Sequence, residues 1–454
     1  MNCDLLLQGG RVLVTPDRWI SADIAISQGQ IVAIVPNVST TSESAIPDTI
    51  ASSASSPSSP TVASNSEVDG TGAGIAAQQI LDVTGKLISP PFVESHIHLD
   101  SALTAGEPRW NQSGTLFEGI EIWRDRKRNL SLEDVKQRAI ATLKQQAMQG
   151  VLFVRSHADV SEPSLTALQA LLEVREAVKD WMTLQVVAFP QDGIYGSPGN
   201  EALLEEALKQ GADGVGGIPH YELTREDGVR SIQRIFELAE QYDRWIDIHC
   251  DEIDDDQSRF LEVVSACALR REMGDRVAAS HTTAFGSYNN AYAFKLLGFL
   301  QRSRINFIAN PLINITLQGR TDSYPKRRGV TRVKELWQAG LNVSLGHDCV
   351  QDPWYSLGTG NMLDVAMMAI HVCQMTGTAE IDACYNMVTW NGAKTLGVAD
   401  QYGIAIGQPA NLLVLDAGDR YDALRRRATV QTVISQGRIL AETPPSHPVW
   451  RGQN

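Results

Sequence analysis

Two histidines separated by a single residue, His96 and His98, open the part of the sequence whose side chains could do chemistry. They follow an apolar run at residues 87–89 that is typical of a strand. Side chains two residues apart in a strand project from the same face, so these imidazoles can share one metal ion. Two histidines on a solvated strand face would show the same spacing, so a metal site needs further ligands.

Further candidate ligands stand where other predicted strands give way to loops: His249, followed by Glu252, then His281 and Asp348. The carboxyl ends of barrel strands meet around one opening, so these side chains can converge on one ion. Imidazoles with a carboxylate favour Zn²⁺ or Fe²⁺ over Ca²⁺ and Mg²⁺, which prefer oxygen ligands. Taken singly, an Asp after a strand is usually a turn cap, and a His in a barrel is usually a hydrogen-bonded core residue.

A divalent ion with an open position lowers the pKa of bound water toward about 7 and supplies hydroxide at neutral pH. Glu252 lies on the loop directly after a candidate ligand, where a carboxylate can carry protons from that water to a leaving group. The sequence therefore predicts a metal-dependent hydrolase.

Strand-like and helical segments alternate after His98. The apolar, β-branched segments are 151–155, 183–189, 214–218, 245–249, 276–281, 305–309 and 341–346. The segments with helical spacing are 132–148, 165–178, 201–210, 228–242, 258–273, 292–302 and 333–338. With the strand before His96, this pattern predicts eight parallel strands joined by crossover helices. We therefore predict an α/β fold whose (β/α)8 TIM-type catalytic barrel spans residues 91–400.

Both ends of the chain are predicted to be β-structure. Short strands are predicted within 4–36 and 79–88, helices around 359–375 and 382–396, and strands again within 403–416 and 430–441. We expect residues 1–90 and 401–454 to form one small discontinuous β-sandwich. Residues 38–75 are rich in Ser, Thr, Ala and Pro, and we expect a disordered insertion there.

The composition limits the class of protein. The net charge is −14, from 39 basic and 53 acidic residues, which disfavours nucleic-acid binding because such binding comes from Lys and Arg on phosphates. No apolar run approaches the roughly 18 residues needed to cross a bilayer, and the N-terminus lacks a secretory signal. The six cysteines form no C-x-x-C pair. We expect a cytoplasmic protein without nucleic-acid or membrane partners.

Long contiguous motifs in this chain resemble those of bacterial cytosine deaminases of the amidohydrolase superfamily. The matching segments are 90–100 (PPFVESHIHLD), 111–120 (NQSGTLFEGI), 189–191 (FPQ), 249–254 (HCDEID), 280–283 (SHTT), 310–312 (NPL), 346–348 (GHD) and 352–355 (DPWY). The resemblance covers nearly the whole chain except residues 38–75.

This resemblance implies a single Fe²⁺ or Zn²⁺ ion. The implied ligands are His96, His98, His249 and Asp348. Binuclear relatives need a carboxylated Lys at the end of the fourth strand, whereas this chain has Ile-Pro-His at 218–220. The ligand set suits iron and zinc equally, so the sequence does not choose between them. Relatives are commonly multimeric, and we expect a homo-oligomer.

The resemblance also implies catalytic roles. Glu252 would carry protons to the ring nitrogen N3, His281 would orient the hydroxide, and Asp348 would also accept its proton. The residues implied to contact the pyrimidine are Gln191, which would read its amide edge, and Phe189 and Trp354, which would wall its ring. Metal-bound hydroxide would attack C4 of cytosine, 5-methylcytosine or both, giving uracil or thymine and ammonia.

One position departs from the family pattern. Cys349 stands where cytosine deaminases commonly have a second acidic residue, beside C5 of the bound pyrimidine. A neutral thiol makes that side of the pocket less polar, and burying a methyl group is worth about 0.8 kcal/mol. We hypothesise a preference for 5-substituted cytosines such as 5-methylcytosine. The alternative, which the sequence supports equally, is that Cys349 only packs as a small hydrophobic residue and has no effect on specificity.

Several alternatives stay open at this stage. The same site could remove an amine from another N-heterocycle, such as an s-triazine or isoguanine. Ring-opening hydrolysis of the dihydroorotase type is disfavoured by the missing Lys. His220-Tyr221-Glu222 matches the H-x-E half of nucleic-acid deaminases, but the P-C-x-x-C half is absent. A non-enzymatic barrel is disfavoured because no candidate ligand is missing.

Overall fold

The computed structural model describes residues 1–37, 74–445 and 449–451. The insertion predicted at 38–75 therefore lies, except for its last two residues, outside the described residues. The described chain forms two eight-stranded sheets, one parallel and one mixed. Every helix in these ranges is too short or too polar to cross a bilayer.

The parallel sheet is a closed barrel. Its strands are β6 (Phe92–Ile97), β7 (Val151–Asp159), β8 (Thr183–Phe189), β9 (Gly214–Gly217), β10 (Trp245–Cys250), β11 (Val277–His281), β12 (Asn306–Ala309) and β13 (Val343–Leu345). They neighbour one another in chain order. The last and first strands meet where Ile97 bridges Asp348 in parallel and the Asp348 N–H donates to the His96 carbonyl oxygen. The predicted (β/α)8 barrel is confirmed.

Helices connect the barrel strands, and every residue of β6 and β7 is buried, as expected for a parallel sheet covered on both faces. The connecting helices are α2 (Leu132–Met148), α3 (Thr166–Val178), α4 (Asn200–Lys209), α5 (Arg225–Tyr242), α6 (Phe260–Arg270), α7 (Asn290–Ser303) and α9 (Val333–Gln338). After β13 come α10 (Met362–Val372), α11 (Thr378–Met387) and α12 (Trp390–Thr395).

The structure differs from the sequence predictions in several elements. The helix predicted around 382–396 is two helices, because Thr389 adopts a non-helical conformation (φ −131°, ψ −103°) before α12. The break lets Gly392 pack against the Val93 side chain in β6. Three further helices lie in segments whose pattern predicts no element: α1 (Leu116–Lys127), α8 (Pro311–Leu317) and α13 (Arg420–Arg426).

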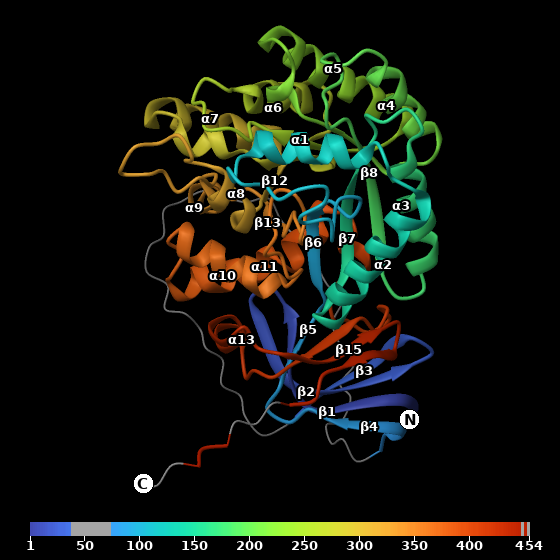
Figure 1. Cartoon of the computed structure of the whole chain (residues 1–454). Coiled ribbons are helices and arrows are strands. Elements are labelled where there is room, and N and C mark those ends of the chain that lie inside the picture. The colour runs from blue at the N-terminus through green and yellow to red at the C-terminus, as the bar shows by residue number, and fades with distance from the viewer. Residues whose placement is uncertain (38–73, 446–448, 452–454) are drawn as a thin grey trace.

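The mixed sheet combines strands from both ends of the chain, and Figure 1 shows the blue and red strands together below the barrel. Its order is β16 (Arg438–Glu442), β15 (Val430–Ser435), β14 (Leu412–Leu415), β5 (Leu87–Ser89), β1 (Asn2–Thr15), β2 (Arg18–Ser27) and β3 (Gln30–Pro36), with β4 (Ala76–Asp82) also paired to β1. β5 leads within three residues into β6, so this sandwich-like unit feeds directly into the strand that carries His96.

Candidate active site

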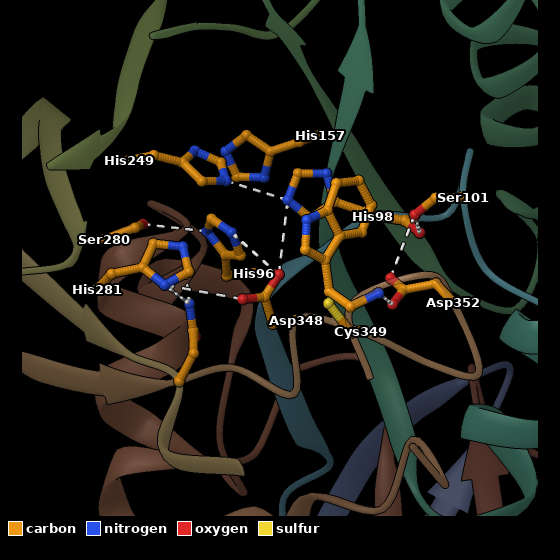
Figure 2. A network of polar contacts seen from close by, with 12 residues as sticks. His96, His98, Ser101, His157, His249, Ser280, His281, Asp348, Cys349 and Asp352 are labelled. Carbon is orange, nitrogen blue, oxygen red and sulfur yellow. Dashed lines mark hydrogen bonds and ion pairs between the residues drawn. The ribbon is translucent and has the colours of Figure 1, made fainter. Parts of the chain in front are cut away.

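The carboxyl ends of β6, β10 and β13 bring together the four residues predicted to bind a metal ion (Figure 2). The Nε2 atoms of His98 and His249 lie 3.1 Å apart. Asp348 Oδ1 lies 3.6 Å from His96 Nε2 and 3.5 Å from His98 Nε2. All four side chains are buried. The structure therefore places the predicted ligands around one point, although they span about 250 residues of sequence.

Hydrogen bonds set the tautomer of His96. Ser280 Oγ donates to Asp247 Oδ1 (2.5 Å) and can accept from His96 Nδ1 (3.1 Å). With the proton on Nδ1, the unprotonated Nε2 faces Asp348. Within the described ranges this buried Nε2 has no hydrogen-bond partner. In a typical metal-binding imidazole, hydrogen bonds hold one ring nitrogen protonated, and the other, unprotonated nitrogen can donate its lone pair to the metal ion.

Burial keeps the candidate ligands in the form that binds metal. It lowers the pKa of His96 to about 4 and holds the pKa values of His98 and His249 well below that of free histidine. Their imidazoles are therefore neutral at pH 7. The donor atoms of His96, His98 and Asp348 lie within 4.8 Å of one another, so these residues fit a divalent ion of the Zn²⁺ or Fe²⁺ type.

Glu252, His281 and Asp348 form a second cluster of close polar side chains, which shares Asp348 with the candidate metal ligands. His281 Nδ1 lies 3.1 Å from Glu252 Oε1 and 3.7 Å from Asp348 Oδ2. Burial raises the pKa of Glu252 to about 8, and burial followed by the charge of Glu252 raises that of Asp348. Two carboxyl groups held this way can retain a proton at neutral pH and pass it on.

Glu252, His281 and Asp348 line a cavity of about 350 Å³, a volume that includes its opening. Its polar wall holds His98, His249, His281, Glu252, Asp348 and Gln191, and its apolar wall holds Leu116, Ile218, Ile313, Leu317, Cys349 and Trp354. The predicted substrate residues Gln191, Cys349 and Trp354 therefore face one space next to the candidate metal ligands. Figure 2 shows Cys349 directly beside Asp348.

Phe189 is not among the residues that line this cavity, and its predicted contact with the substrate ring stays a prediction. Its ring stacks on that of His249, with centroids 4.0 Å apart and planes 17° apart, and it also contacts His98 edge-on. Phe189 is the last residue of β8 and is fully buried. Its ring contacts help to hold these two candidate ligands in place.

His157 belongs to the cluster but is not among the residues predicted from the sequence. Its ring centroid lies 4.1 Å from that of His96 and 4.9 Å from that of His249, and its Nε2 is 3.6 Å from Asp247 Oδ1. Within the described part of the chain, neither ring nitrogen has a hydrogen-bond partner. β7 extends four residues beyond the predicted segment 151–155, and His157 follows Arg155 at the two-residue spacing of its strand face.

Asp352 orients the loop that carries Cys349 and Trp354. Its Oδ1 accepts hydrogen bonds from the backbone N–H groups of Trp354 (3.0 Å) and Tyr355 (2.9 Å), and its Oδ2 accepts one from Ser101 Oγ (3.3 Å). The loop after β13 is thereby tied to the loop after β6.

Left-handed backbone conformations gather at the strand ends of this site. They occur at Asp251 (φ 53°), His281 (φ 67°), Thr282 (φ 46°) and Asp348 (φ 70°). Such conformations are uncommon for residues other than glycine and are unfavourable for a β-branched side chain such as that of Thr282. Their concentration here agrees with a functional site, where surrounding contacts maintain strained backbone.

Sequence comparison identifies the group of enzymes to which this site belongs. The amidohydrolase family profile matches residues 79–441, which include the whole barrel and every residue of the site. The chain belongs to the amidohydrolase family. It is therefore a hydrolase, as the motifs predict, and a divalent metal ion is the cofactor of this superfamily.

Proteins similar to this amidohydrolase include another amidohydrolase and two deaminases. N-isopropylammelide isopropyl amidohydrolase from Pseudomonas sp. (strain ADP) is 28% identical over 368 residues, 80% of this chain and 88% of the relative. Pterin deaminase from Rhizobium rhizogenes is 28% identical over 373 residues, 81% of this chain and 83% of the relative. The structure of 5-methylcytosine deaminase from Klebsiella pneumoniae, liganded with 5-fluorocytosine, is 45% identical with a TM-score of 0.87, covering 98% of this chain and 99% of that chain.

Proposed function

We propose that this amidohydrolase hydrolytically deaminates a free aminated pyrimidine, cytosine or 5-methylcytosine, to uracil or thymine and ammonia. One observation carries the proposal: Gln191, Cys349 and Trp354 line the same cavity as the candidate metal ligands and the proton-carrying Glu252. The similarity to a 5-methylcytosine deaminase over almost the whole chain supports the same substrate class.

We propose a single Fe²⁺ or Zn²⁺ ion held by His96, His98, His249 and Asp348. When bound, the ion supplies hydroxide by lowering the pKa of water. The end of β9 offers Ile218 to the cavity in place of a bridging Lys. The protein accordingly provides ligands for one ion at this position.

The remaining side chains bind the base and move protons. Gln191 can donate and accept hydrogen bonds at the amide edge of the pyrimidine, and the indole of Trp354 packs against its ring. His281 orients the attacking oxygen. Glu252, which is buried 3.1 Å from His281, would carry one proton of the attacking water to N3. Asp348 would accept the second proton, which passes to the amine so that ammonia leaves as the C4–N bond breaks.

Cys349 is the residue that would make the enzyme prefer 5-methylcytosine over cytosine. Its side chain is buried in an apolar cluster with Ile313 and Leu317, against which Trp354 packs. Burial raises the pKa of its thiol well above the ordinary value, so Cys349 is uncharged. A neutral, apolar wall accepts a methyl group without desolvating a carboxylate.

The test is kcat/KM for ammonia release from cytosine and 5-methylcytosine, measured side by side on metal-loaded wild type and the Cys349→Asp variant. We expect wild type to favour 5-methylcytosine by at least about fourfold, the value of one buried methyl group, and Cys349→Asp to reverse the preference. Cys349→Ala, which keeps the wall neutral, is the matched control and should retain it. Metal analysis of each preparation should give one ion per chain.

Two results would contradict this proposal. An unchanged preference in Cys349→Asp would remove Cys349 from the determinants of specificity while leaving the deaminase intact. Inactivity on both pyrimidines, with ammonia released from an s-triazine, pterin or isoguanine, would replace the substrate class.

A further inference from the structure

Helix α1 contacts Trp354, a residue that lines the substrate cavity, at a glycine. Gly119 is buried in the first half of α1 and lies against the indole of Trp354. A Cβ at this position would fall 2.3 Å from Trp354 Cδ1 and 2.4 Å from Nε1, far inside van der Waals contact. Glycine is less favourable than alanine inside a helix, and the backbone here is not in the left-handed region, so helix geometry gives no reason for it. The close contact with Trp354 explains the glycine, because a side chain at this position would clash with the indole.

The indole is held against α1 from two sides. Trp354 Nε1 donates to the carbonyl oxygen of Leu116, one turn before Gly119 (3.2 Å). The backbone N–H of Trp354 is held by Asp352. Trp354 also lines the cavity, together with Cys349 and Leu116. The position of Trp354 therefore sets how wide the cavity is beside Cys349.

The far end of α1 is anchored and resists displacement. Lys127 Nζ donates to Asp159 Oδ2 (2.8 Å), at the end of β7, and to Asp192 Oδ2 (2.6 Å), in the loop after β8. Trp123 Nε1 donates to the same Asp159 oxygen (2.9 Å), and Arg124 donates to Asp192 (2.9 Å). Because close-packed interiors leave no spare volume, a methyl group added at residue 119 must displace the indole toward the cavity.

We propose that Gly119 is a specificity-determining residue, which by lacking a side chain lets Trp354 retreat far enough for a 5-substituent to fit beside Cys349. Gly119 touches no substrate and acts through Trp354. The inference rests on the proposed deamination of 5-substituted cytosines at this site. It identifies Trp354, positioned by Gly119, as the part of the apolar wall next to Cys349 that limits the room for a 5-substituent.

The experiment compares kcat/KM for cytosine, 5-fluorocytosine and 5-methylcytosine in wild type and Gly119→Ala. We expect the ratio of 5-methylcytosine to cytosine to fall about tenfold, the usual effect of one misplaced methyl group in an apolar pocket, with 5-fluorocytosine between them. Gly298→Ala is the matched control: it makes the same change inside α7, where a Cβ meets nothing within 4 Å, and should leave the ratio unchanged.

The same substitution in a Trp354→Ala background tests whether Trp354 transmits the effect. With the indole gone, the added methyl group meets no ring, and Gly119→Ala should leave the ratio unchanged. If Gly119→Ala alone does not fold, comparing Trp354→Ala with the double variant still tests the role of Gly119. A persistent effect there would overturn the inference. Wild-type activity with an unchanged ratio in Gly119→Ala would overturn the inference alone, whereas wild-type inactivity toward all three bases would overturn the proposed function and the inference with it.

Discussion

The carboxyl group of Glu252 has the burial and the neighbours that proton transfer requires. Its side chain is buried, it lies 3.1 Å from His281, and burial raises its pKa to about 8. We predict that Glu252→Gln, which keeps the shape and removes the titrating oxygen, lowers kcat by about 10²- to 10⁴-fold, the usual share of general acid–base catalysis.

The measurement is steady-state kcat on the preferred base, together with the metal content of each preparation. Glu121→Gln is the control, because Glu121 is exposed on α1 away from the cavity and should behave as wild type. A Glu252→Gln enzyme that keeps its metal and works within a few-fold of wild type would remove Glu252 from the reaction.

Sequence could predict those site residues that stand just at or past a strand end, because that position alone implies the barrel mouth. His96, His98, His249, His281 and Asp348 all qualify, and the structure brings them together. Phe189 also ends a strand, and its ring stacks on that of His249, a contact that spacing does not reveal. His157 could not be found while β7 was expected to end at residue 155.

At the scale of elements, the anchor of α1 is a buried ion pair with a predictable stability. Lys127 is 7% exposed and lies between Asp159 and Asp192, which are 4% and 12% exposed. We predict that Lys127→Met lowers the free energy of unfolding by about 3–5 kcal/mol, because it leaves the buried Asp159 carboxylate without its cation and Asp192 with Arg124 alone. Denaturant unfolding of the metal-loaded protein measures the change.

A matched control for this prediction is the exposed pair Lys136 and Glu173, whose Nζ and Oε2 atoms are also 2.8 Å apart. Lys136→Met should cost no more than about 1 kcal/mol, since water screens the pair and side-chain entropy opposes it. Equal losses in the two variants would show that α1 does not depend on its buried anchor.

The elements that the sequence predicts well are those whose buried positions hold apolar residues at regular spacing. Helices such as α2 bury Val135, Ala139, Leu143 and Ala147 at four-residue steps, and the pattern alone predicts their bounds. α1 gives no such pattern because two of its buried positions are Gly119 and Lys127, which are retained for contacts with Trp354 and with Asp159. Tertiary contacts, which a linear pattern does not contain, decide this helix.

At the scale of the whole molecule, the net charge of −14 predicts how the enzyme meets its substrate. An acidic protein steers cations and repels anions, and salt screens both effects, but a neutral nucleobase feels neither. We predict that kcat/KM for the preferred base changes less than about twofold between roughly 50 and 500 mM salt. A steep dependence on salt would indicate a charged substrate and contradict the proposed nucleobase.

The position of β5 in the mixed sheet has a consequence for biosynthesis. β5 is flanked by β1 on one side and by β14 on the other, and β14 comes after the entire barrel in the chain. While a ribosome is still translating the barrel, the edge of β5 beside buried Leu87 and Ile88 has no partner. An open apolar edge of this kind is a hazard for aggregation. The strand that leads to His96 and His98 therefore gains its last neighbour only when translation has passed residue 415, so the nascent chain is more exposed to misassembly than the finished enzyme.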